Sequence, residues 1–168
     1  MKIICVISDV DGDRYCVRER NKLKVAADLL ALTTQSLIKL VDHLKKKYSK
    51  RHNVKRVIEG FVPQQIQETL PTSEYVAYTE NKGDKIAFCL DTKKKGGRLI
   101  DINTLTYVAV HELSHIATQS IGHTDEFWKN FKFLLIEAVK IGIYEPVDYS
   151  KQPKPYCGIE ISKNIYYI

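Results

Sequence analysis

The longest regular pattern of apolar positions in the chain recurs every three or four residues and predicts one helix of about seven turns. The periodic positions are Leu23, Ala27, Leu30, Thr34, Leu37, Val41, Leu44 and Tyr48. Asn21, just before the first of them, is the candidate N-cap. The same stripe suits a coiled-coil seam, but we expect a helix laid across a sheet.

Alternating and β-branched residues predict two β-hairpins. The first joins strands over residues 2–8 and 15–18 through an acidic turn that contains an Asp-Gly pair. The second joins strands over 75–79 and 85–90 through an Asn-Lys-Gly-Asp turn at 81–84. The four strands of these hairpins should therefore form two antiparallel pairs.

The remaining segments complete a mixed order of helices and strands. Residues 54–58 are rich in β-branched side chains and predict a strand, while 63–69 predict a short helix opened by its proline. Residues 103–118 and 125–141 carry apolar positions at helical spacing. Residues 144–168 contain three prolines and should be mostly irregular. We predict an α+β fold in one domain over residues 1–168, with its core at about 15–141.

Composition narrows the class of protein. Hydrophobic residues make up 44% of the chain and charged residues 27%, which is typical of a globular domain. No run approaches the roughly eighteen apolar residues of a membrane span. The cysteines are widely spaced, without a C-x-x-C pair: Cys5, Cys16, Cys89 and Cys157. We interpret them as free or buried thiols of a reducing compartment, which predicts an intracellular protein, cytoplasmic or nuclear.

The net charge of +6 is concentrated in two basic clusters. The 45–52 cluster contains Lys45, Lys46, Lys47, Lys50, Arg51 and His52. The 93–98 cluster contains Lys93, Lys94, Lys95 and Arg98. Such runs suit an acidic partner such as DNA, although a solvated helix end and a lysine-rich loop explain them equally well.

The residue types that carry chemistry gather in an H-E-x-x-H motif and the histidine that follows it. His111 and His115 are four positions apart, about one helical turn, so both imidazoles can bind one metal ion from the same helix face. Glu112 would then lie beside the metal, where its carboxylate can polarise a water. Gly122 lets the chain reverse and bring His123 to the same ion. Zinc is the metal that most readily takes three protein ligands and an open fourth position.

Three alternatives stay open at this point. The motif can be a buried helix with two incidental histidines. A glutamate from the later helix, Glu126 or Glu137, can replace His123 as third ligand. The zinc site can also be structural, in a DNA-binding or scaffold protein without catalytic activity, although no fourth ligand is evident nearby.

The motif region resembles the WLM family of minigluzincin-like metallopeptidases and is similar to the related SprT-like (Spartan) proteases. The resemblance covers about residues 15–141 and rests on three segments: Cys89-Leu90-Asp91, His111-Glu112-Leu113-Ser114-His115 and His123-Thr124-Asp125-Glu126-Phe127-Trp128. It implies a zincin fold, His123 as third ligand, and proteolysis of DNA-crosslinked or SUMO-tagged proteins. Related short WLM-like proteins are encoded by cells and by large DNA viruses. Ile3 to Ile7 loosely resembles a SUMO-interacting segment, although an ordinary buried strand explains it better.

These features predict a zinc-dependent metallopeptidase in which Glu112 is the general base. We expect an extended peptide substrate to pair with the strand at 85–90. The residue that stabilises the transition state is not identified, and the candidates are Tyr75, Tyr78, Tyr144, Tyr149 and Tyr156. An enzyme that acts on a non-peptide bond is also compatible with the motif.

Overall fold

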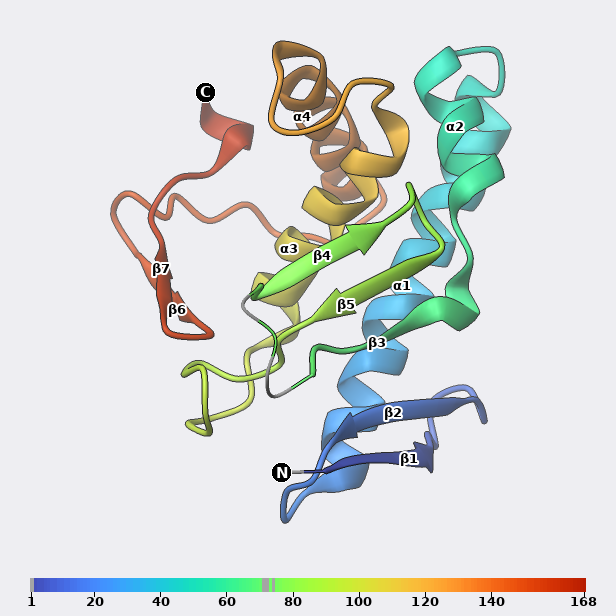
Figure 1. The fold of residues 1–168 in the computed structure, drawn as a ribbon. Helices are drawn as coiled ribbons and strands as arrows, with labels where there is room; N and C mark the ends of the chain where they lie inside the picture. The colour runs from blue at the N-terminus through green and yellow to red at the C-terminus, as the bar shows by residue number, and fades with distance from the viewer. Residues whose placement is uncertain (1, 71–72, 74) are drawn as a thin grey trace.

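A small mixed sheet lies in front of two long helices in the computed structural model, which describes residues 2–70, 73 and 75–168 (Figure 1). Strand β3 (Ile66–Glu68) pairs in parallel with β5 (Lys85–Phe88), and β4 (Ala77–Glu80) pairs antiparallel with the other side of β5. The hairpin predicted for β4 and β5 is confirmed. The prediction that a peptide pairs with the strand at 85–90 is wrong, because β5 is hydrogen-bonded to a strand on each side. The edge of the sheet beyond β5 belongs to β4.

The two helices behind the sheet are α1 (Leu23–Tyr48) and α3 (Ile102–Ala117). The long helix predicted from the apolar stripe is confirmed, and it crosses the sheet as expected. Its N-cap is Lys22, with no side-chain hydrogen bond, so Asn21 as the cap is wrong. Helix α3 is capped by Asp101, whose carboxylate accepts from the Thr104 amide at 2.9 Å. Its side chains are buried on most faces, because α1, α2 (His52–Gly60) and α4 (Asp125–Lys140) all pack against it.

Residues 52–60 form helix α2 (His52–Gly60), so the predicted strand at 54–58 is wrong. Val54 and Val57 are three positions apart, lie on one helix face and are fully buried. Packing of that face outweighs the modest strand preference of β-branched residues. The predicted helix at 63–69 is correct only for a single turn at Pro63–Gln65, because β3 begins at Ile66 and joins the sheet.

The first predicted hairpin is confirmed as β1 (Ile3–Ile7) and β2 (Arg14–Arg18). Strand β2 is largely buried, whereas β1 is partly exposed. The buried strand expected for Ile3 to Ile7 is therefore a strand, but only a partly buried one. Cys5 lies directly opposite Cys16 in the register, and the two form a disulfide.

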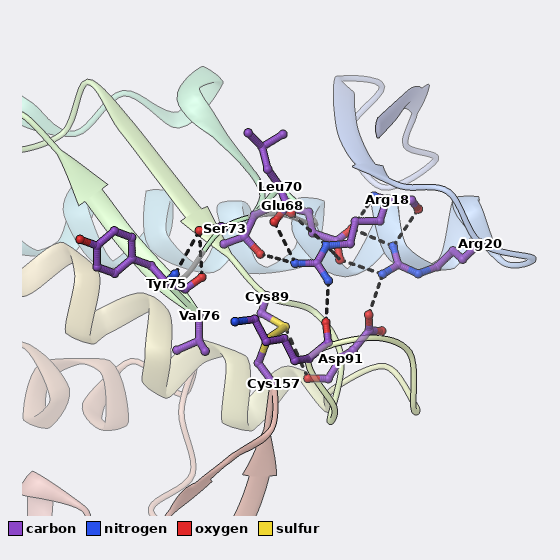
Figure 2. Close-up of polar contacts among 12 residues, drawn as sticks. Arg18, Arg20, Glu68, Leu70, Ser73, Tyr75, Val76, Cys89, Asp91 and Cys157 are labelled. Atoms are coloured by element: carbon purple, nitrogen blue, oxygen red, sulfur yellow. Dashed lines mark hydrogen bonds and ion pairs between the residues drawn. A yellow bond between two sulfur atoms is a disulfide. The ribbon is translucent and has the colours of Figure 1, made fainter. Parts of the chain in front are cut away.

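A cluster of ion pairs fastens this hairpin to the sheet. Arg20 donates to both carboxylate oxygens of the fully buried Glu68, at 2.8 and 2.7 Å, and contacts Asp91 at 3.1 Å (Figure 2). The Nε of the buried Arg18 donates to the Thr69 carbonyl at 3.0 Å. Two-pronged contacts between a guanidinium and a carboxylate fix geometry as well as charge. The hairpin, β3 and the residues after β5 are thereby held as one corner of the molecule.

Most of residues 144–168 lie outside helices and strands, as predicted, but the segment also contains a hairpin and a helical turn that were not predicted. The hairpin consists of β6 (Lys154–Tyr156) and β7 (Ile159–Ile161), and the helical turn lies at Ile165–Tyr167. Cys157 and Gly158 form the two-residue turn with φ of 51° and 82°, a conformation usually signalled in sequences by Asn-Gly. Tyr149, Tyr156 and Ile165 are buried and extend the core beyond residue 141.

A second disulfide joins Cys89, just after β5, to Cys157 in the β6–β7 turn (Figure 2). The interpretation of the four cysteines as thiols is therefore wrong, since none is free in the structure. The pairing could not be predicted from the spacing of the cysteines. The register of β1 and β2 brings Cys5 to Cys16, and the fold of the C-terminal segment brings Cys157 to Cys89. The predicted reducing compartment rested on free thiols and loses that support. Among the described residues, no helix is long and apolar enough to cross a membrane.

Candidate metal centre

Helix α3 presents two of the three motif histidines toward one point. The His111 and His115 rings are 5.2 Å apart between centroids, as their separation of one helical turn predicts. Both side chains are partly buried. The helix is held among other elements along most of its length, so the orientation of this pair is set by the core.

The third histidine arrives from the loop between α3 and α4 (Asp125–Lys140). Gly122 has a φ of 87°, a left-handed conformation that reverses the chain and is accessible to glycine at little cost. Thr124 then caps α4 by accepting from the Phe127 amide at 3.3 Å. The structure thereby brings His123 to the motif pair, with ring centroids 5.0 Å from His111 and 5.1 Å from His115.

One ligand atom from each of these histidines lies within 4.8 Å of the other two. Within the described parts of the chain, no other group of histidine, cysteine or carboxylate side chains gathers in this way. Imidazole nitrogens at this spacing suit a divalent transition metal such as zinc. The residues present therefore fit the predicted ion.

Phe127 forms the floor beneath all three imidazoles. Its fully buried ring lies 4.4 Å from His115, 4.7 Å from His123 and 5.0 Å from His111 between centroids. Trp128 packs against both His123 and Phe127, at 5.3 and 5.1 Å between centroids. Aromatic packing of this kind restricts the rotation of the histidine rings and keeps the three nitrogens close together.

Glu112 is buried beside the histidines, and both oxygens of its carboxylate are engaged. Oε1 accepts from the Thr79 hydroxyl at 3.1 Å, and Oε2 lies 3.0 Å from Nδ1 of His111. A carboxylate only accepts, so Nδ1 is the protonated nitrogen of that contact, and Nε2 of His111 keeps its lone pair for a metal. Glu112 is thus fixed next to the ligand set and is not one of the three clustered ligands.

The loop that carries His123 is clasped from two sides. From the β4–β5 turn, the Lys82 ammonium donates to the carbonyls of His115 and Ser120, both at 2.9 Å. From α4, Glu126 accepts from the amides of Gln119 and Ser120 at 2.9 and 3.0 Å and from the Ser120 hydroxyl at 2.7 Å. These bonds lower the pKa of Glu126 to about 2, with the Gln119 amide as the largest contribution. Burial lowers the pKa of Lys82.

The two alternative third ligands are occupied elsewhere. Glu126 faces the loop amides, as just described. Glu137 is buried farther along α4, where its carboxylate contacts Nε2 of His43 at 3.0 Å and the Lys140 ammonium at 3.0 Å. Neither glutamate belongs to the clustered group, so the structure favours His123 over both.

The protonation of the histidines also suits a metal. Burial is the main cause that lowers the pKa of His115, to about 4, and burial likewise lowers the pKa of His123. Both imidazoles are therefore neutral near pH 7, which is the form that binds metal ions.

The centre opens onto a pocket of about 530 Å³ between α3 and the free edge of β4. Of the five candidate tyrosines, Tyr75 and Tyr78 line it. Tyr144 and Tyr149 are buried and bond to each other at 2.8 Å. Tyr156 is buried with its hydroxyl donating to the Val76 carbonyl at 3.2 Å. Tyr75 and Tyr78 therefore remain as candidates to contact a substrate.

Both basic clusters are exposed, but neither lines this pocket. The 45–52 cluster lies at the junction of α1 and α2, and the 93–98 cluster lies in the loop after β5, toward the opposite corner of the molecule in Figure 1. Among the described residues, no lysine of either cluster forms an ion pair. The Lys94 carbonyl accepts from the Arg18 guanidinium at 2.9 Å, which ties the second cluster to the β1–β2 corner.

Comparison with known proteins finds relatives among viruses. The chain is 33% identical over 164 residues to uncharacterized protein R325 of Acanthamoeba polyphaga mimivirus, an alignment that covers 95% of this chain and 83% of the relative. It is 37% identical over 70 residues to uncharacterized protein 136R of Invertebrate iridescent virus 6, covering 41% of this chain and 39% of that protein. It is 38% identical over 85 residues to uncharacterized protein 042R of Invertebrate iridescent virus 3, covering 49% and 50%. No family model and no solved structure matches the chain. The relatives belong to large DNA viruses.

Proposed function

We propose that this chain, which belongs to one family with uncharacterized protein R325 of Acanthamoeba polyphaga mimivirus, is a zinc-dependent metallopeptidase. The observation that carries the proposal is the gathering of His111, His115 and His123 around one point, with the carboxylate of Glu112 fixed beside them. Three histidines without a fourth protein ligand in the described residues leave a coordination position open, which favours catalysis over a purely structural zinc site.

Zinc bound by the three imidazoles would supply Lewis-acid activation of a water molecule and of the scissile carbonyl. The role of Glu112 is to take the proton of the attacking water and return it to the leaving amine. Its Oε1 is held for this by the Thr79 hydroxyl on the edge strand, at the pocket onto which the centre opens. Phe127 and the Lys82 contacts keep the third ligand in place.

The free edge of β4 is the natural docking site for the substrate main chain. The Cys89 amide donates to the Val76 carbonyl at 2.7 Å, so the backbone groups of Val76, Tyr78 and Glu80 face β5. Those of Ala77 and Thr79 alternate with them and face the open edge, on the pocket that holds the histidines. An extended peptide can pair with this edge and lie across the metal centre.

The zincin fold and the WLM or SprT-like family are parts of the same proposal. The H-E-x-x-H helix packed behind a strand with a free edge supports them. The two exposed lysine clusters support nucleic acid as a partner, and hence DNA-crosslinked proteins as substrates, whereas SUMO-tagged substrates rest on the family resemblance alone. The alternative is a DNA-binding or scaffold protein without activity. It would use the same lysine clusters, but Glu112 would not act as a general base.

The substitution Glu112→Gln tests the proposed function. It keeps the size of the side chain and removes the proton acceptor, so we expect unchanged zinc content and loss of most proteolysis of an unfolded protein substrate. General bases typically contribute about 10²–10⁴-fold to rate. Zinc is measured by elemental analysis and cleavage by gel electrophoresis and mass spectrometry.

A matched control is Glu59→Gln, because Glu59 lies on α2 outside the metal pocket. That variant should retain both zinc and activity. Full activity in Glu112→Gln would contradict the proposed role of the carboxylate, and zinc loss would make Glu112 a ligand. A wild-type protein that binds zinc stoichiometrically and cleaves no polypeptide would favour the scaffold alternative.

A further inference from the structure

The metal pocket adjoins a second hollow along the edge of β4. This second hollow has a volume of about 500 Å³ and is lined by Leu70, Ser73, Tyr75, Tyr78, Thr79 and Glu80. Tyr75, Tyr78 and Thr79 line both hollows. Together the two form what we call the edge groove, which runs from the His123 loop, past the metal centre, to the residues before β4.

Large apolar side chains are exposed at intervals along the edge groove. Ile121, beside His123, is 89% exposed, Tyr75 is 60% exposed, and Leu70 at the far end is 44% exposed. None of the three adds much to the core of this chain at such exposure. Burial of such apolar surface by a partner is favourable, and exposed apolar side chains along a cleft are typical of a binding surface.

The exposed tyrosine is held in position before any partner arrives. The hydroxyl of Ser73 accepts from the Tyr75 amide at 3.1 Å and donates to the Tyr75 carbonyl at 3.2 Å (Figure 2). The Tyr75 ring packs edge-on against the Tyr78 ring, at 6.0 Å between centroids. A side chain ordered in advance loses less conformational entropy on binding, which strengthens its contribution to affinity.

The charges of the edge groove do not suit a phosphate backbone. No lysine of the 45–52 or 93–98 clusters lines either hollow. Lys82 does line the metal pocket, but its ammonium already donates to two carbonyls. The groove also contains the carboxylates of Glu80 and Glu112. What it offers is a free strand edge flanked by apolar side chains.

We propose that the edge groove selects extended polypeptide segments that carry large apolar side chains, with Ile121 and Tyr75 as the contacts that determine specificity. The inference rests on the proposed function and names the substrate class of the same site. Large apolar side chains are mostly buried in folded proteins. The substrates are therefore unfolded or locally opened protein chains, and nucleic acid, where it is bound, lies outside the groove.

The test uses two labelled unstructured peptides that differ only in leucine against serine at alternate positions. Their Kd values are measured by fluorescence anisotropy on the full chain with Glu112→Gln, so that binding is read without cleavage. We expect the leucine peptide to bind at least about tenfold more tightly, since small differences in apolar contact are worth roughly 10–200-fold.

Ile121→Ser and Tyr75→Ser should each reduce this preference for the leucine peptide. Ile7→Ser is the matched control, because Ile7 is 53% exposed and lies in β1, outside the groove.

Equal affinity for the two peptides, or a preference that survives both groove substitutions, would overturn the inference. Displacement of the peptide by a single-stranded oligonucleotide whose own binding is lost in Tyr75→Ser would overturn it in favour of base stacking on the tyrosine. Cleavage of both peptides by the unsubstituted protein with equal kcat/KM supports the peptidase and refutes the selectivity. Selective binding without any cleavage supports the groove and counts against the proposed function.

Discussion

Glu112 owes its position to a threonine 33 residues earlier in the chain. The spacing of His111, Glu112 and His115 is enough to predict a metal site, because helix geometry alone puts the two imidazoles on one face. Thr79 gives no such signal, since it reads as an ordinary strand residue. Its role depends on β4 lying along α3, which a single sequence does not specify.

The third ligand shows the same limit at the scale of single residues. A glycine before His123 made the turn predictable, and Gly122 indeed has a positive φ. The clasp by Lys82 and Glu126 was not predictable, because it joins the β4–β5 turn and the first turn of α4 to one loop. Charged side chains in turns are usually explained by solvation alone.

Substitution of each candidate third ligand should distinguish a residue that binds zinc from one that only positions the ligand. We expect His123→Ala to lose most zinc affinity, because it removes a ligand atom. Glu126→Ala should weaken affinity less, by about 10–100-fold at most, as a residue that orients a ligand. Glu137→Gln should leave affinity unchanged. Competition with a chromophoric chelator measures all three.

Unchanged zinc affinity in His123→Ala would contradict this assignment of the third ligand. A simultaneous loss of affinity in Glu126→Ala or Glu137→Gln would identify the carboxylate that replaces it.

At the scale of elements, patterns longer than about three turns or closed by a turn signal were predictable, and short ambiguous ones were not. The seven-turn stripe and both hairpins belong to the first group. Residues 54–58 belong to the second. Val54, Val57 and Ile58 have helical spacing, but their β-branched side chains favour a strand, and so short a segment does not decide between the two until its packing partner is known. The β6–β7 hairpin was missed because cysteine, and not asparagine, precedes glycine in its turn.

The two basic clusters are separate elements, and we expect each to contribute independently to DNA affinity. Substitution of Lys45, Lys46 and Lys47 by glutamate, or of Lys93, Lys94 and Lys95, should weaken binding and flatten its salt dependence. Each lost phosphate contact should reduce the slope of log K against log salt by about 0.9 on duplex DNA. Sequence preference should be slight, since lysine clusters contact mainly the backbone. Titrations at several salt concentrations measure the slope.

Zinc content in both triple variants should match that of the unsubstituted protein, because the clusters lie outside the metal pocket. Equal DNA binding by all three proteins at low salt would return the lysines to the role of solvated surface.

At the scale of the whole molecule, one disulfide closes the N-terminal hairpin and the other ties the C-terminal segment to the residue that follows β5. Cys5–Cys16 closes the first hairpin, with a sequence separation of 11, and Cys89–Cys157 connects positions 68 apart. Disulfides persist in oxidising environments, which include the surface of virus particles. Relatives among large DNA viruses are compatible with such a setting.

Protein purified from an oxidising host should not react with a thiol reagent until it is reduced and unfolded, when four cysteines should react. Cys89→Ser should lower the free energy of unfolding by about 2–4 kcal/mol, and Cys5→Ser by less, because the shorter loop restricts the unfolded chain less. Urea denaturation measures both. Four reactive thiols in the native protein would contradict the pairing.

The packing of residues 156–165 also sets an order of events during synthesis. The Cys157 amide donates to the Asp91 carbonyl and the Ile165 amide to the Tyr107 hydroxyl, so this segment closes the side of the molecule against which α3 lies. At about 5–20 residues per second, Ile165 leaves the ribosome roughly two to eight seconds after His123. During that interval His111, His115 and His123 have all been synthesised, but residues 156–165 do not yet pack on the side of the molecule where α3 lies. None of the residues that line the metal pocket lies in this late segment, so the three histidines can come together before the core is fully covered.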